Sequence, residues 1–157
     1  KTRSEGFGAE VKKRILMGTY FLSSGCYERY YLKAVKVRAL IKEDFQRLFR
    51  RFDVLVTPTT PTLPFRLGEY AEESFDIYSS DRYTLPVNMA GLPALSLPCG
   101  FIEGLPVGMQ IMGPAFAEGN ILEVAYAFEQ NTPYHRQRPA HRGKPALETA
   151  KGSEFND

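Results

Sequence analysis

The residue types that usually carry out covalent catalysis are present in this sequence, but not in catalytic patterns. The two histidines, His135 and His141, both lie in a basic stretch near the C-terminus, and no G-x-S-x-G sequence marks a nucleophilic serine. Cys99 follows an expected strand with no general base near it in the sequence, so a buried structural thiol is favoured over a nucleophile. We therefore expect no catalytic residue in this chain.

A metal site and a phosphate-binding loop are not predicted either. The His, Cys, Asp and Glu residues do not cluster at the spacing of metal ligands. Gly100 and Gly104 lie in an expected hairpin rather than at the start of a helix. The sequence thus predicts no metal and no cofactor bound by this chain. Cys26 and Cys99 are expected to be free thiols in a reducing compartment rather than a disulfide.

Two charged residues are better suited to binding a small molecule than to catalysis. Asp81 lies at an expected helix start, where the helix dipole and backbone N–H groups keep a carboxylate ionised, and such a carboxylate suits an ammonium group. Arg14 lies among apolar residues of an expected helix, and its guanidinium can bind a carboxylate through two hydrogen bonds. Together the pair would suit the zwitterion of an α-amino acid. The alternatives are an aspartate that only caps a helix and a surface arginine.

Hydrophobic periodicity predicts the elements that carry these residues. Helices are expected over residues 10–22, 27–52, 81–89 and 119–130, and strands over residues 53–58, 94–98 and 107–112. The second helix carries basic residues between its apolar positions, for which a solvated face is favoured over a nucleic-acid site. The strands contain few alternating polar residues, which indicates that both of their faces are covered and that they belong to a larger sheet.

The stretch over residues 81–114 organises the predicted fold. Its four Leu-Pro steps are expected to mark the ends of its elements, because proline has no N–H to donate. These steps end at Pro86, Pro93, Pro98 and Pro106. A hairpin loop is expected over residues 100–104. We expect the stretch to form one wall of a small-molecule pocket, with Asp81 at its mouth.

The bulk composition is that of an ordinary globular protein. The chain has 157 residues, of which 43% are apolar and 24% are charged, and its net charge of +2 is too small to indicate nucleic acid or a membrane surface. No apolar run approaches the roughly 18 residues of a membrane-spanning helix. We expect one domain over residues 1–139 and a polar, partly mobile tail over residues 140–157. The Gly-Ser-Glu-Phe sequence within that tail is compatible with a cloning remnant.

Three stretches of the sequence resemble the amidase-signature family. They are GFGAEVKKRILMGTYFLSSG, DVLVTPTTPTLPFRLGE, and DRYTLPVNMAGLPALSLPCGF followed by GLPVGMQIMGP. The third stretch is similar to many amidases, whereas the first is more specific to the A subunits of tRNA-dependent amidotransferases. The resemblance covers roughly residues 1–139. It implies an α/β fold, namely the C-terminal portion of the amidase-signature fold with a mixed central sheet covered by helices, incomplete in this chain.

The resemblance also implies a role in protein biosynthesis. The A subunits of the family hydrolyse glutamine with a Ser–cis-Ser–Lys triad, and the ammonia travels to a B subunit. That subunit uses ATP and Mg²⁺ to amidate misacylated Glu-tRNA(Gln) or Asp-tRNA(Asn), and it makes most of the tRNA contacts. The partners implied for this chain are therefore glutamine and subunits B and C in a heterotrimer, with no membrane contact. The implied location is cytoplasmic, as in bacteria, and an organellar location is the alternative.

The catalytic motifs of the family have no counterpart in this sequence. The resemblance thus implies that the chain supplies the glutamine-binding wall and is inactive by itself. Arg14 resembles the residue that holds the α-carboxylate of glutamine, and Asp81 resembles the residue that holds its α-amino group. Cys26 departs from the family, which commonly has Tyr after the SSG sequence. Two alternatives remain, a fragment of a general amidase and a non-catalytic binding module.

Overall fold

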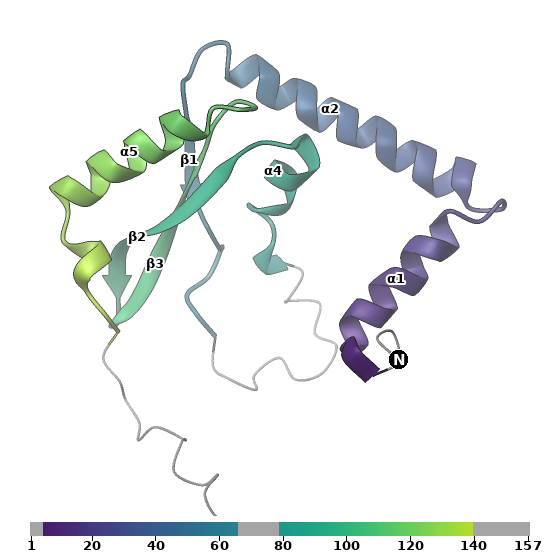
Figure 1. Ribbon diagram of the computed structural model, residues 1–157, viewed down its shortest axis with the longest axis horizontal. Helices are drawn as coiled ribbons and strands as arrows, with labels where there is room; N and C mark the ends of the chain where they lie inside the picture. The colour runs from purple at the N-terminus through teal and green to yellow at the C-terminus, as the bar shows by residue number, and fades with distance from the viewer. Residues whose placement is uncertain (1–4, 66–78, 140–157) are drawn as a thin grey trace, which may run out of the picture.

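A computed structural model describes residues 5–65 and 79–139 of the chain (Figure 1). The helices are α1 (Ala9–Phe21), the π-helical turn η2 (Tyr27–Tyr31), α2 (Leu32–Leu48), α4 (Leu85–Ala90), α5 (Glu118–Asn131) and the 3₁₀ turn η3 (Tyr134–Arg136). The strands are β1 (Leu55–Pro58), β2 (Ala94–Ile102) and β3 (Leu105–Met112). The expected helices and strands are all present, but several of their boundaries differ. None of the helices in the described ranges has the length and apolar character needed to span a bilayer.

The three strands form one antiparallel sheet in the order β1-β3-β2. The central strand β3 pairs on both sides, so that Ile111 lies opposite Val56 of β1 and Leu95 of β2. Successive side chains of a strand point to opposite faces. Ile111 and Gln110 of β3 therefore point to different faces of the sheet.

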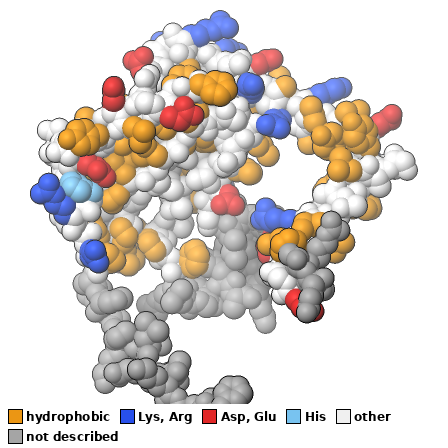
Figure 2. Space-filling view, viewed as in Figure 1, with side chains coloured by type: hydrophobic (Ala, Val, Ile, Leu, Met, Phe, Trp, Pro, Cys, Tyr) orange, Lys and Arg blue, Asp and Glu red, His pale blue; other side chains and the backbone are white. Residues whose placement is uncertain are grey.

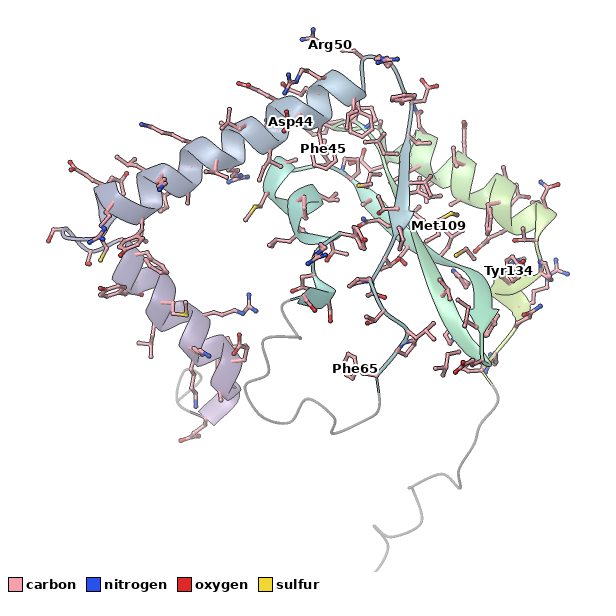
Figure 3. The ribbon with its side chains drawn as sticks, turned by 180° about the vertical axis from the view of Figure 1, so that it is seen from behind. Asp44, Phe45, Arg50, Phe65, Met109 and Tyr134 are labelled. Carbon is pink, nitrogen blue, oxygen red and sulfur yellow. The ribbon has the colours of Figure 1, made fainter. Side chains whose placement is uncertain are left out.

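Helix α5 covers one face of this sheet, and the core of the protein lies between them (Figure 1). Ile121 and Ala125, one helical turn apart on α5, pack with Leu97 and with Ile111, whose exposed fraction is 0%. Partly buried residues complete this cluster, namely Val54, Leu95, Met109 and Phe128. Figure 3 shows Met109 next to β1. Leu122, which follows Ile121 on α5, is 61% exposed and lies outside this cluster.

The other face of the sheet is approached by α4 and by the C-terminal end of α2. Arg38 of α2 donates from Nε to the carbonyl of Met89 at 2.7 Å, which joins α2 to the last turn of α4. Gly91 ends α4 in the left-handed conformation with φ of 69°, as the sequence predicted. The expected start of this helix was wrong, because Asp81 lies in a turn and regular helix begins only at Leu85.

Two of the four Leu-Pro steps do not mark element ends. Pro86 lies in the first turn of α4 and Pro93 directly precedes β2, as expected. Pro98 instead lies within β2, where the register shifts between Pro98 and Gly100, and such bulges tolerate a residue without an N–H. Pro106 lies within β3 beyond the end of β1, where one edge of β3 has no strand partner among the described residues. The hairpin loop consequently shortens to Glu103-Gly104.

Helices α1 and α2 form an arm that leads away from the sheet (Figure 1). The first helix of the arm lies where it was predicted. The single helix expected over residues 27–52 is instead the π-helical turn η2 followed by α2, which ends at Leu48. Neither α1 nor α2 contains a buried residue, and apolar side chains such as Ile15 and Leu40 are 48% and 60% exposed. Figure 2 shows hydrophobic side chains at the surface of the arm and an open space between the arm and the rest of the protein. The amphipathic faces predicted for both helices are therefore present without a covering layer within residues 5–65 and 79–139.

We expect the α5–sheet core to dominate the stability of this chain. Replacing Ile111 by Ala removes a fully buried side chain and should lower the free energy of unfolding by about 2–5 kcal/mol. The same change at Ile102, which is 53% exposed, is the matched control and should have a much smaller effect. Urea denaturation of both variants measures the difference. Equal losses for the two variants would show that the core lies elsewhere.

Candidate functional site

Asp81 begins a four-residue turn that leads into α4. Its backbone carbonyl accepts hydrogen bonds from the N–H groups of Thr84 at 3.2 Å and Leu85 at 2.8 Å. The residue is exposed, and its carboxylate makes no hydrogen bond or ion pair with the described part of the chain. The idea that Asp81 caps the helix was wrong, since Thr84 occupies the capping position of α4 and no side chain caps it. An exposed carboxylate on a backbone-bonded turn is suited to bind a cationic group.

Arg14 lies in the middle of α1. Its Nε is 2.9 Å from Oε1 of Glu10, one helical turn earlier, and both side chains are more than half exposed. An exposed pair of this kind contributes only about 0–1 kcal/mol to stability. Arg14 and Asp81 lie on different elements, and no ion pair between them is described within residues 5–65 and 79–139.

A groove of about 490 Å³ lies beside the Asp81 turn. One wall is the irregular segment that follows β1, and the opposite wall is the hairpin end of β2 and β3. Ser80, the neighbour of Asp81, also lines it. Phe65, which Figure 3 shows at the far end of the segment after β1, is part of the same lining. This volume is within the range of small-molecule sites, and its lining is predominantly apolar with a few hydroxyl groups.

A second, more polar pocket of about 270 Å³ lies between α4 and the sheet. Its lining includes Thr59, Ser96 and Gln110, and the two hydroxyl groups are 2.6 Å apart. Gly108 allows this approach, because a Cβ there would lie 2.8 Å from Oγ1 of Thr59. Gln110 is 4% exposed and donates from Nε2 to Oγ1 of Thr57 at 3.1 Å and to the carbonyl of Tyr83 at 3.0 Å. These bonds join the sheet to the segment after β1 and to the Asp81 turn.

The residues considered for catalysis occupy unremarkable positions. Cys26 is buried and Cys99 is half-buried, both as free thiols as predicted, and the Cys99 thiol donates to the carbonyl of Val107 at 3.5 Å. His135 accepts a hydrogen bond at Nε2 from Nε of Arg136, whereas His141 lies outside the described residues. No group of three or more His, Cys, Asp or Glu residues that could hold a metal ion occurs in the described ranges.

One titratable group near the corner of the arm is perturbed. A hydrogen bond with the Cys26 thiol, with a smaller contribution from the charge of Cys26, raises the pKa of Tyr20 above its ordinary value of 10.0.

The sequence analysis missed the side chains that hold the Asp81 turn in place. Arg38 was assigned to a solvated face, but it binds the last turn of α4. Gln110 was interpreted only as part of a strand. The signal that could have identified it is a single amide between apolar neighbours in GMQIMG, because a buried polar side chain needs partners.

Comparison with known proteins identifies the class of protein. A family model described as Amidase matches residues 1–122, which is more than half of the chain, so the chain belongs to the Amidase family. The solved structure of an aryl acylamidase of the amidase signature family, at 23% identity, shows the same fold with a TM-score of 0.67 over 87% of this chain and 29% of that chain. The predicted α/β fold of the amidase-signature type is thereby confirmed.

More specific similarity is to one kind of amidase. The chain is 63% identical over 138 residues to the A subunit of the glutamyl-tRNA(Gln) amidotransferase of Moorella thermoacetica, which covers 88% of this chain and 28% of the relative. The corresponding protein of Geobacillus stearothermophilus is 58% identical over 138 residues, again covering 88% and 28%. The crystal structure of the corresponding protein of Thermotoga maritima is 44% identical, with a TM-score of 0.64 over 85% of this chain and 29% of that chain. The chain thus spans about 28% of the length of these curated relatives.

We expect Gly108 to be required for the packing of the segment after β1. Replacing it by Ala should lower the free energy of unfolding by about 1–3 kcal/mol, since the added Cβ would overlap the Thr59 hydroxyl. Gly100 is the matched control, because a Cβ there meets no atom within 4 Å. Thermal unfolding of the two variants checks this. Unchanged stability of Gly108→Ala would mean that the Thr59–Ser96 contact is not part of the folded state.

Proposed function

We propose that this chain supplies the glutamine-binding part of the glutaminase component of a tRNA-dependent amidotransferase. The single observation that carries the proposal is the 63% identity over 138 residues to the Moorella thermoacetica amidotransferase protein. Arg14 and Asp81 both lie within residues 1–122, which match the Amidase family model. In this role the glutaminase hydrolyses glutamine, and the ammonia amidates Glu-tRNA(Gln), Asp-tRNA(Asn) or both. Subunits B and C are the partners, and the B subunit uses ATP and Mg²⁺ and binds most of the tRNA.

The chemistry of two side chains supports glutamine as the ligand. A guanidinium binds a carboxylate through two parallel hydrogen bonds, which fits Arg14 to the α-carboxylate. The exposed carboxylate of Asp81 fits the α-ammonium group. Holding both groups of the zwitterion leaves only the side-chain amide free to extend toward a nucleophile. In the proposed glutaminase that nucleophile and the layer covering the apolar faces of α1 and α2 both come from the remainder of the amidase domain.

The binding role is tested in the full-length glutaminase, meaning a polypeptide that combines this chain with the rest of the amidase domain, assembled with its partner subunits. Asp81→Asn keeps the shape of the side chain but removes its charge. It should raise the KM for glutamine about 30-fold, or about 2 kcal/mol, because the ammonium loses its counter-charge. Activity with ammonium chloride in place of glutamine should stay unchanged, since this nitrogen source bypasses the site.

The matched control is Asp44→Asn on α2, where the carboxylate pairs with Arg47 at the surface (Figure 3). This variant should retain the original KM. Arg14→Lys should also raise the KM, because an ammonium group cannot form the two parallel bonds of a guanidinium. An unchanged glutamine KM in Asp81→Asn would sink the assignment, and turnover of simple amides without tRNA-dependent activity would favour a general amidase.

We also expect the 157-residue chain to have no glutaminase activity by itself. This expectation rests on the sequence, which has no counterpart of the family's catalytic motifs, so in the proposed glutaminase the groups that cleave the amide come from the remainder of the amidase domain. Release of glutamate from glutamine measures this directly. Release above a no-protein control that persists in the Asp81→Asn variant reports a contaminant, whereas release that the variant abolishes would contradict the proposal.

A further inference from the structure

Gln110 is the one buried polar side chain among the described residues, and it lies on the central strand β3. Both protons of its amide nitrogen have acceptors, the Thr57 hydroxyl on β1 and the carbonyl of Tyr83. Buried polar groups are retained in proteins when they are satisfied in this way. The side chain thus connects the rigid centre of the sheet to a point two residues beyond Asp81.

The segment that Gln110 holds is bonded as one unit with Asp81. The Asp81 carbonyl accepts from the N–H groups of both Thr84 and Leu85, which closes the turn onto the start of α4. The other end of α4 is held by Arg38, through the Met89 carbonyl. Among the described residues, these two side-chain hydrogen bonds join the turn and the helix to the rest of the protein, in addition to the packing of Val87 and Ala90. The Gln110 bond is the one that lies next to Asp81.

We propose that Gln110 is a positioning residue, which sets the location of the Asp81 carboxylate by holding the Tyr83 carbonyl against the sheet. The inference rests on the proposed function, in which Asp81 binds the ammonium group of glutamine. Without the amide, the Tyr83 carbonyl loses its donor, and an exposed turn regains one by moving toward water. That displacement carries Asp81 away from the ammonium group while the remote reacting groups stay in place.

The test uses the full-length glutaminase in its complex, with glutamine as the probe. Gln110→Met keeps the length of the side chain and removes both donors. It should raise the glutamine KM about tenfold while kcat stays within about twofold, because an interaction that holds substrate equally in the ground and transition states affects KM alone. Gln130→Met, the same change at an exposed position of α5, is the matched control and should leave both constants unchanged.

A double-mutant cycle separates positioning from a general structural role. If Gln110 acts through Asp81, adding Gln110→Met to Asp81→Asn should raise the KM no further. Hydrogen exchange gives an independent measurement, since Gln110→Met should speed exchange at the amides of Thr84 and Leu85. If Gln110→Met does not fold, Gln110→Leu replaces it, because this apolar side chain also lacks both donors and places no charge at the buried position.

The outcomes are distinct. An unchanged KM in Gln110→Met, or multiplied KM effects in the double variant, would overturn the positioning role. If Asp81→Asn raises the KM and Gln110→Met does not, this inference fails and the proposed function stands. If Asp81→Asn itself leaves the KM unchanged, the glutamine site fails and the positioning role fails with it.

Discussion

The structure depends on one strand, β3, whose two faces are held by different interactions. On one face Ile111 is completely buried against α5 and forms the centre of the core. On the other face Gln110 is buried with both of its amide protons bonded, one to β1 and one to the turn before α4. Burial of the apolar face stabilises the sheet, but the hydrophobic effect is non-directional and does not fix the orientation of neighbouring segments. The directional bonds of the amide then determine where the neighbouring loops lie.

The residues that stabilise the fold are different from the candidate ligand-binding residues. The hydrophobic cluster under α5 requires only that its side chains fill space, and no candidate ligand-binding residue belongs to it. The candidate binding residues lie outside this cluster, with Asp81 on an exposed turn and Arg14 on a helix that has no buried residue. Such residues are free of packing constraints, so their side chains can be selected for charge and shape.

The arm formed by α1 and α2 has exposed apolar faces, which are typical of a part of a larger domain. Its helices have the predicted apolar periodicity, yet side chains such as Leu16 and Leu40 are 70% and 60% exposed in the described structure. A stable domain normally buries such faces. The chain spans about 28% of the length of relatives such as the Moorella thermoacetica protein. The apolar faces of α1 and α2 therefore indicate packing contacts that residues 5–65 and 79–139 do not themselves provide.

The sequence alone determined most of the secondary structure and the candidate binding residues. The periodicity of apolar residues predicted α1, α2, α4, α5 and the three strands, whereas the 3₁₀ turn η3 was not predicted. Gly91 predicted the end of α4, and the EVKKRI and DRYTLPVN segments drew attention to Arg14 and Asp81. These features depend on residues that are neighbours in the sequence, so they can be predicted without the tertiary structure. Only the tertiary structure decided that Pro98 and Pro106 lie inside strands, that Leu122 is exposed, and that Gln110 holds the Asp81 turn. Each of these findings depends on the spatial neighbours of the residue, such as the edge of a strand, solvent or a carbonyl that is distant in the sequence. The spacing of residues in the sequence does not identify such neighbours.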